Sequence, residues 1–201
     1  MLMSVDERKA ACEIAVEVAK KYGKTVHVQI GAGTMRDSIE LATHAASAGA
    51  DGISSVPLSG FKHEEQMEYY KAIVSAAGIQ TVLYYMPGPG REFSLSQILE
   101  TLSVPGVTGI KVSSNDFFFT QQIMNACPDN IVVFNGKDEY LAPSVIHGAH
   151  GGIGLWANVF PGAYSAIYNN ASAGNLKRAF EIQKELNAFC CIAMRHGLLK
   201  S

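Results

Sequence analysis

The fold is indicated first by the stretch Pro105-Gly106-Val107-Thr108-Gly109-Ile110-Lys111-Val112, in which a glycine turn directly precedes a run of β-branched residues. Such a run is typical of a buried strand. The same order recurs at Ala48-Gly49-Ala50-Asp51-Gly52 and at His147-Gly148-Ala149-His150-Gly151. Each glycine stands where a helix must turn tightly back into a strand. The chain is therefore predicted to alternate helices with strands.

Six strand-like runs extend this pattern in both directions, with centres roughly 20 to 30 residues apart, as in β-loop-α units. The runs are 25–30, 52–56, 81–85, 107–112, 130–134 and 152–156. Segments of helical period fill the rest at 5–22, 35–48, 63–77, 94–103, 114–127, 138–147, 161–172 and 174–197. Strands joined by helices run parallel. Two architectures stay open, an open doubly wound sheet and most of a (β/α)8 barrel.

Helix-end signals support these boundaries. Ser4 and Glu7 have the spacing of a capping box, and Gly23 follows the same helix as a C′ glycine. Ser94 is expected to cap the helix that Pro105-Gly106 closes. No linker or low-complexity tract interrupts the chain, so we expect a single domain over residues 1–201.

Composition excludes several classes of protein. The 201 residues are 48% hydrophobic with a net charge of −2, which excludes disorder and gives no electrostatic footprint for nucleic acid or membrane surfaces. No apolar run of about 18 residues is present, and the first residues show no secretory signal. The cysteines lack C-x-x-C spacing, so we expect a cytoplasmic protein with Cys190 and Cys191 as buried thiols.

Reactive groups in either architecture gather at the carboxyl ends of the strands. The polar residues expected there are Gln29, Ser54, Ser55, Tyr84, Tyr85, Lys111, Ser113, Asn135, Asp138, Glu139 and Asn158. Lys111 stands out, because a strand lysine in a desolvated site loses basicity, and a neutral amine attacks a ketone to form a Schiff base. The alternative is a lysine that reaches solvent or pairs with Asp116.

Tyr84 and the pair Asp138 and Glu139 are the next candidates. The Tyr84 phenol ends the strand before Lys111 and could move a proton, or it could simply fill space with its hydroxyl bonded to backbone. The two carboxylates could accept hydrogen bonds from polyol hydroxyls, or stabilise a helix start through its dipole.

Three other motifs fail as sites. Gly31-x-Gly33 lacks the third glycine of a dinucleotide site, and Gly88-Pro89-Gly90 lacks the Lys-Ser/Thr of a P-loop. His147 and His150 lack a third zinc ligand. The run Phe117-Phe118-Phe119 is expected to be a packed helix face.

Four motifs occur in order that together resemble the dihydrodipicolinate synthase/N-acetylneuraminate lyase family of pyruvate-dependent class I aldolases, over essentially the whole chain. They are Tyr84-Tyr85-Met86-Pro87, Gly109-Ile110-Lys111-Val112-Ser113-Ser114, Asn135-Gly136-Lys137-Asp138-Glu139 and Gly151-Gly152-Ile153-Gly154-Leu155-Trp156-Ala157-Asn158.

The resemblance implies a (β/α)8 barrel in which Lys111 forms the Schiff base with a 2-keto acid and Tyr84 shuttles the proton. It implies substrate contacts for Ser113, Gly136, Asp138, Glu139 and Ile153, and no metal or organic cofactor. The Gly-x-Asp-Glu stretch is similar to the lyase branch.

The chain departs from the family at several positions. Pro89 replaces the arginine of the synthase branch and Arg91 stands two residues later, which favours cleavage of a polyhydroxylated 2-keto acid. Leu155 replaces a hydroxyl residue of the lyases, and Leu58-Ser59 replaces the usual aromatic pair. The loop that binds the substrate carboxylate, with the first two strands, is expected upstream of residue 1.

We therefore expect a lyase that releases pyruvate from an N-acetylneuraminate-like acid, working as a homo-oligomer, a dimer or tetramer, with no nucleic acid or membrane partner. The alternatives are a synthase-type pyruvate condensation, a non-catalytic partner subunit with unpaired strand edges, and a doubly wound binding module.

Overall fold

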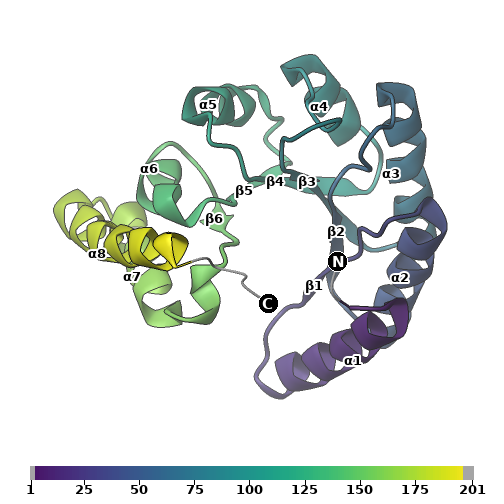
Figure 1. Cartoon of the computed structure of the whole chain (residues 1–201), viewed down its shortest axis with the longest axis horizontal. Coiled ribbons are helices and arrows are strands. Elements are labelled where there is room, and N and C mark those ends of the chain that lie inside the picture. Colours follow the sequence, from purple (N-terminus) through teal and green to yellow (C-terminus); the bar gives the residue numbers. More distant parts are fainter. Residues whose placement is uncertain (1–2, 197–201) are drawn as a thin grey trace. The chain divides into compact units, whose positions relative to one another are not determined.

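The computed structural model describes residues 3–196, in which strands and helices alternate along the chain (Figure 1). The strands are β1 (His27–Gln29), β2 (Gly52–Ser55), β3 (Gln80–Tyr85), β4 (Val107–Val112), β5 (Val132–Asn135) and β6 (Gly151–Gly152). The α-helices are α1 (Val5–Lys21), α2 (Met35–Ala48), α3 (His63–Ala77), α4 (Leu95–Leu102), α5 (Phe117–Ala126), α6 (Leu141–Ile146), α7 (Pro161–Ser172) and α8 (Leu176–Arg195). Two 3₁₀ helices, η1 (Asp138–Tyr140) and η2 (Trp156–Asn158), complete the described elements.

The helices begin and end where side chains satisfy their free backbone groups. At the start of α1 the Ser4 hydroxyl accepts the Glu7 amide at 3.3 Å, and the Glu7 carboxylate accepts the Ser4 amide at 2.7 Å. Ser94 and Gln97 form the same capping box at α4. The predicted capping box at Ser4 and the predicted cap at Ser94 are thus confirmed, which explains why these helix starts could be placed from sequence.

The strand order is sequential, β1-β2-β3-β4-β5-β6, in one sheet. The recorded pairs are parallel, with His27 opposite Gly52, Gly52 opposite Gln80, and Phe134 opposite Gly151. A doubly wound sheet reverses its strand order at a switch point, so the sequential order excludes that alternative. The fold class is α/β with the topology of a (β/α)8 barrel, of which residues 3–196 carry six strands.

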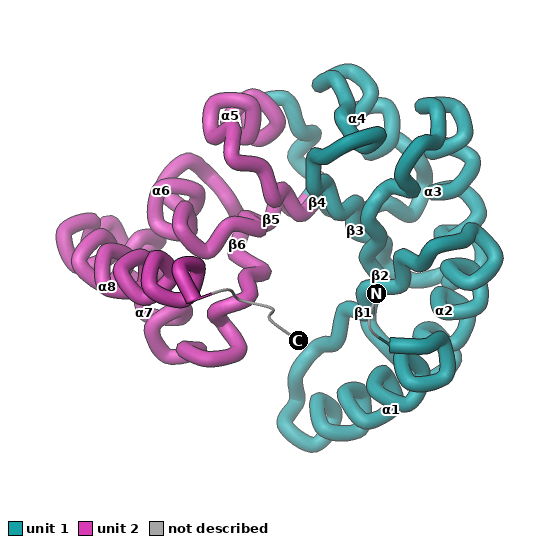
Figure 2. The backbone as a smooth tube through the Cα atoms, in the orientation of Figure 1, with its two compact units in different colours: residues 1–110, 126–131 teal, residues 111–125, 132–201 magenta. Residues whose placement is uncertain are grey.

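The chain divides into two compact units, which are described separately (Figure 2). Unit 1 comprises residues 1–110 and 126–131, and unit 2 comprises residues 111–125 and 132–201. The single domain expected from the sequence therefore stays a prediction.

The core of unit 1 lies between its strands and α3. Ile30, Ile53 and Leu83 from the strands are at most 2% exposed, and Tyr69 and Tyr70 from α3 are fully buried. Both buried phenols are bonded at β2, since the Tyr70 hydroxyl donates to the Ser55 carbonyl at 2.7 Å and the Tyr69 hydroxyl lies 2.5 Å from the Ser55 hydroxyl. Helix α3 is thereby tied to the end of a strand by polar as well as apolar contacts.

The core of unit 2 lies among α6, α7, α8 and η2. Leu141, Ile167 and Ala179 are fully buried there. The Trp156 and Phe189 rings meet edge to face with centroids 5.0 Å apart, a favourable aromatic geometry. This packing anchors the segment after β6 to the last helix.

The sixth predicted strand is the main difference from the sequence analysis. A strand over 152–156 was expected, but β6 ends at Gly152 and Trp156 begins η2. The amides of Leu155 and Trp156 donate to the Asp138 carboxylate at 2.9 and 3.3 Å, so they cannot continue a strand ladder. The fifth strand also begins later than expected, because the Ile131 amide closes a turn with the Pro128 carbonyl at 2.9 Å.

Two burial predictions were wrong. Cys191 is exposed while Cys190 is buried, since adjacent residues of α8 lie on different sides of the helix. Phe118 is 69% exposed, so the Phe117–Phe119 run does not form one packed face. Within the described residues no helix is long and apolar enough to span a membrane.

Candidate active site

The loops that follow the strands of unit 1 enclose a cavity of about 560 Å³. Gln29 and Gly31 line it after β1, Leu58 after β2, and Tyr84 and Arg91 at and after the end of β3. Of the polar residues expected at the carboxyl ends of these strands, Gln29 and Tyr84 line the cavity, whereas Ser55 and Tyr85 are buried. Tyr84, the predicted proton shuttle, is therefore a wall residue of a cavity large enough for a small molecule.

The loop after β3 is a tight turn that presents Arg91. The Arg91 amide donates to the Gly88 carbonyl at 2.8 Å, with Pro89 and Gly90 between them and a φ of 71° at Gly90. Proline followed by a residue of positive φ is the type II turn. The neighbouring loop holds this turn, because the Ser59 hydroxyl donates to the Pro89 carbonyl at 3.1 Å and the Gly60 amide to the Gly90 carbonyl at 3.2 Å.

Gln66 and Arg8 hold the backbone of the segments that line the cavity. Gln66, 1% exposed on α3, bonds both backbone groups of Leu58, accepting its amide at 3.1 Å and donating to its carbonyl. Arg8 on α1 donates to the carbonyls of Gln29 and Gly31 at 2.6 and 3.0 Å. The loop after β2 is thus held by buried hydrogen bonds, and the end of β1 by one exposed and one partly buried bond.

In unit 2 Lys111 lies on β4 between Ile110 and Val112, which are at most 1% exposed. Its side chain runs along Gly136 on the neighbouring loop. A methyl group added to Gly136 would lie 2.9 Å from the Lys111 Cε and 2.0 Å from the Ser113 hydroxyl. The Ser113 hydroxyl donates to the Gly136 carbonyl at 3.2 Å, and the Gly136 amide donates to the Val112 carbonyl at 2.7 Å. Lys111, Ser113 and Gly136 therefore form one packed group.

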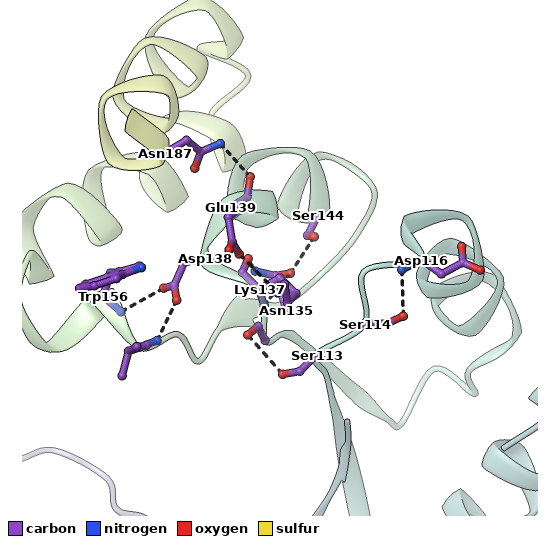
Figure 3. A network of polar contacts seen from close by, with 12 residues as sticks. Ser113, Ser114, Asp116, Asn135, Lys137, Asp138, Glu139, Ser144, Trp156 and Asn187 are labelled. Atoms are coloured by element: carbon purple, nitrogen blue, oxygen red, sulfur yellow. Dashed lines mark hydrogen bonds and ion pairs between the residues drawn. The ribbon is translucent and has the colours of Figure 1, made fainter. Parts of the chain in front are cut away.

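Asp138, drawn in Figure 3 beside Trp156, is the most buried acidic candidate; its exposure is 6%. Its two carboxylate oxygens accept the amides of Leu155 and Trp156, at the start of η2. Burial raises the pKa of Asp138, while these two amides and the Lys111 charge lower it and Glu139 raises it. The Tyr164 hydroxyl lies beside this carboxylate, and burial followed by the Asp138 charge raises the pKa of that phenol. The Asp138 carboxylate thus holds the loop after β6. Its charge also interacts with the charge of Lys111.

Glu139 lies on the same turn but keeps its carboxylate accessible. Its Oε2 is 3.9 Å from the Lys137 Nζ, and both side chains are about a quarter exposed, at 25% and 26%. The backbone of the turn is fixed instead by Gln183 on α8, which donates to the Asp138 carbonyl and accepts the Ala142 amide, both at 2.9 Å. Figure 3 shows Asp138 and Glu139 pointing in different directions from this turn.

The remaining predicted residues lie as follows. Ile153 comes directly after β6, with its side chain 41% exposed and its amide donated to the Asn135 carbonyl at 2.8 Å. Ser113, Gly136, Asp138, Glu139 and Ile153 all belong to unit 2 together with Lys111. Tyr84 belongs to unit 1, so its approach to Lys111 stays a prediction.

The glutamines that support the site were not among the residues singled out from the sequence. Gln66 bonds Leu58, 8 residues away, and Gln183 bonds Ala142, 41 residues away. A buried glutamine has no local sequence pattern that marks it. The turn that presents Arg91 could have been found, because Pro-Gly is the signature of a type II turn. Among the described residues no group of three His, Cys, Asp or Glu side chains could hold a metal ion.

Comparisons with known proteins cover almost the whole chain. The model of the dihydrodipicolinate synthetase family matches residues 1–199. The N-acetylneuraminate lyase of Salmonella typhimurium is 34% identical over 99% of this chain and 68% of its own length. The solved N-acetylneuraminate lyase of Fusobacterium nucleatum complexed with pyruvate aligns with a TM-score of 0.91 at 28% identity, over 98% of this chain and 67% of its own.

A second solved structure belongs to the synthases. The dihydrodipicolinate synthase of Bacteroides thetaiotaomicron aligns with a TM-score of 0.86 at 29% identity, over 94% of this chain and 65% of its own. The chain thus spans about two thirds of the length of the relatives it matches, between 65% and 68% for these three.

Proposed function

Because the chain belongs to the dihydrodipicolinate synthetase family, we propose that it is a class I aldolase or lyase that cleaves an N-acetylneuraminate-like 2-keto sugar acid into pyruvate and an aldehyde or amino sugar. The observation that carries this proposal is Lys111, whose Cε packs against the space left by Gly136. A lysine amine in its neutral form attacks a ketone.

The reaction needs only the chain's own groups and water. The Lys111 amine adds to the keto carbon, and loss of water gives an iminium. The bond between the third and fourth carbons then breaks, and its electron pair enters the iminium to give an enamine. The hydroxyl on the fourth carbon loses its proton and becomes the aldehyde. Protonation of the enamine and hydrolysis of the iminium release pyruvate and restore Lys111.

Tyr84 is proposed to move the proton between the substrate hydroxyl and the enamine, since its phenol borders the cavity of unit 1. No metal or organic cofactor is required, because the iminium is the electron sink.

Substrate recognition is proposed for the group around Lys111. The accessible Glu139 carboxylate suits hydrogen bonds from sugar hydroxyls, and Ser113 lies next to the reactive amine through Gly136. Asp138 acts here through the loop that it fixes, on which Ile153 lies. We propose a cytoplasmic homo-oligomer, dimer or tetramer, as the working form.

Two other functions have one observation each in their favour. A non-catalytic subunit that pairs with another chain is favoured by the exposed apolar residues of α1, where Ile14, Val18 and Tyr22 are 63%, 50% and 65% exposed. A synthase-type condensation of pyruvate is favoured by the alignment with a solved synthase at 29% identity.

The proposal is tested by trapping the Schiff base. The full chain is incubated with pyruvate, reduced with borohydride and digested, and the masses of the peptides are measured by mass spectrometry. We expect the mass of one reduced pyruvyl group on Lys111, and its loss in Lys111→Arg. Lys177→Arg, at an exposed position of α8, is the matched control and should trap like the wild type. An unmodified Lys111 at saturating pyruvate overturns the lyase and synthase proposals and leaves the partner subunit.

A further inference from the structure

Helix α1 carries a row of apolar side chains on its exposed surface. Ile14, Val18 and Tyr22 are 63%, 50% and 65% exposed, and they recur every four residues, so they lie along one side of the helix. The exposed Ala11 and Ala15 lie beside them, and these five residues, the α1 stripe, line one groove of about 600 Å³. An exposed apolar row of this kind on a charged helix marks an interaction surface.

The α1 stripe lies outside the packing of unit 1. Helix α1 is tied to α2 by two polar contacts, the Lys9 amine with the Glu40 carboxylate at 2.5 Å and the Glu13 carboxylate with the His44 ring at 2.9 Å. At 100° per residue, Lys9 and Glu13 lie on the opposite side of α1 from the stripe. Neighbouring helices of unit 1 therefore hold α1 by one side and leave the other free.

We propose that the α1 stripe pairs with the same stripe of a second copy of this chain, with the two helices antiparallel. A two-fold axis across the middle of α1 places Ile14 of one copy against Ala15 of the other. It also places Val18 of one copy against Ala11 of the other. Large residues thus meet small ones on both sides of the axis, which is the self-complementarity that a two-fold interface requires.

The charges at the ends of α1 favour a second copy in this direction. Asp6 and Glu7 lie in the first turn of α1, and Lys20 and Lys21 lie in the last. Hydrogen bonds from the Ser4 backbone and hydroxyl lower the pKa of Glu7, which keeps that carboxylate charged at neutral pH. An antiparallel pair brings the acidic end of each copy to the basic end of the other, whereas a parallel pair brings like charges together.

The surface is independent of the proposed chemistry. The α1 stripe lies in unit 1 and takes no part in the lining of the cavity at Tyr84, while Lys111 lies in unit 2. Pairing of copies through α1 therefore does not require a reactive lysine.

The pairing is tested by measuring the mass of the full chain in solution by sedimentation over a dilution series. We expect a dimer of twice the 21.6 kDa of the chain. Val18→Glu should weaken dimerisation about a hundredfold or more, because one carboxylate from each copy would be buried without a partner. Phe118→Glu, at a 69% exposed position of α5, is the matched control and should dimerise like the wild type. If the wild type is a tetramer, Val18→Glu should reduce it to a dimer.

The direction of the helices is tested by cross-linking. Ala15→Cys places a thiol beside the proposed two-fold axis and should give a disulfide between two copies of residue 15 on mild oxidation. Lys24→Cys places it beyond the end of α1, far from its counterpart in an antiparallel pair, and should give none. Peptide mass maps separate these bonds from those of the natural cysteines. A cross-link at residue 24 and none at residue 15 overturns the antiparallel pair.

The outcomes separate this inference from the proposed function. A monomeric wild type overturns it, including a monomer that binds a different protein, and so does a dimer that is unchanged in Val18→Glu or lost equally in Phe118→Glu. A dimer lost only in Val18→Glu, with no trapping at Lys111, supports the surface and removes the lyase. If Val18→Glu does not fold by circular dichroism, Ile14→Glu takes its place, and a wild-type mass in that variant overturns the proposal.

Discussion

In both units a buried glutamine holds the backbone of a loop that follows a strand. The units differ in whether a second buried polar side chain near the loop has hydrogen-bond partners. In unit 1 the buried Gln66 bonds both backbone groups of Leu58, and in unit 2 the buried Gln183 bonds the Asp138 carbonyl and the Ala142 amide. Around these supports, unit 2 pairs its buried Asp138 carboxylate with two backbone amides, whereas unit 1 leaves the Arg91 Nε unpaired beside a cavity.

A buried polar group with its partners in place stabilises one geometry, and Asp138 does this for the loop that carries Ile153 and Leu155. The Arg91 Nε has no such partner, and the His63 Nδ1 and the Tyr164 hydroxyl are likewise buried without one among the described residues. Asp138 therefore holds its loop through hydrogen bonds, whereas the Arg91 side chain depends on packing and on its turn.

The largest expected effect comes from Gly136→Ala in unit 2. The new methyl would lie 2.0 Å from the Ser113 hydroxyl and 2.9 Å from both the Val112 carbonyl and the Lys111 Cε. We expect a loss of about 3 kcal/mol in the free energy of unfolding, measured by urea denaturation, and at least about tenfold slower pyruvate trapping at Lys111. Gly162→Ala, where no atom lies within 4 Å, is the control and should leave both unchanged. Normal trapping in Gly136→Ala would show that Gly136 does not set the lysine's position.

Substituting each glutamine tests how much its hydrogen bonds to the loop backbone contribute to stability in each unit. Gln66→Ala removes the Gln66 partner of both the Leu58 amide and the Leu58 carbonyl, and should cost about 2 kcal/mol in the free energy of unfolding. Gln183→Ala removes the partner of the Ala142 amide, whereas the Asp138 carbonyl keeps its bond from the Leu141 amide, so this variant should cost about 1 kcal/mol. Gln122→Ala, on the exposed side of α5, should change it by less than about 0.5 kcal/mol. Hydrogen exchange should speed up at Leu58 only in the first variant and at Ala142 only in the second. Loss of protection in both units from either variant would contradict two separately held loops.

A smaller effect is expected when the turn of unit 1 is altered. Gly90 has a φ of 71°, and a methyl there would lie 2.9 Å from the Gly60 amide nitrogen. Gly90→Ala should cost about 1–2 kcal/mol in the free energy of unfolding, measured by urea denaturation, because the turn must adopt a conformation that side chains rarely take. Gly162→Ala, where no atom lies within 4 Å, serves as the control. Unchanged stability in Gly90→Ala would contradict the strain assigned to this turn.

The smallest effect is the pH dependence contributed by Asp138. Burial raises its pKa in the folded chain, so between the unfolded and folded values the folded state binds more protons. The contribution of this group to the free energy of unfolding is therefore present at the acidic end of that window and is lost as pH rises through the folded pKa. Urea denaturation of the wild type and Asp138→Asn between about pH 3 and pH 6 should show this slope only in the wild type. Parallel curves would contradict the direction of the shift.

Local signals were sufficient to predict most of the fold. Ser4 and Ser94 marked helix starts through hydrogen bonds to residues three positions away, and the glycines of the repeated turn have φ values of 89°, 97° and 105° at Gly49, Gly106 and Gly148. Contacts within a few residues are readable from a single sequence.

Long-range pairing was not predictable. The strand expected over 152–156 is lost because a carboxylate 17 residues earlier takes the Leu155 amide, and a strand-like composition cannot register that competition. The burial of Asp138 and the unpaired donor of Arg91 likewise depend on which loops meet. The candidate residues could be named from sequence, but their division into paired and unpaired groups required the structure.

Gly136 has a consequence for redesign. A library that broadens the substrate range would randomise the side chains facing the ligand, and a residue without a side chain could be taken for a harmless place to add one. The Ser113 hydroxyl and the Lys111 Cε occupy the volume that any other residue would need there. Libraries should therefore keep Gly136 fixed and vary Glu139 and Leu155, whose side chains have accessible surface into which larger or differently charged groups can grow.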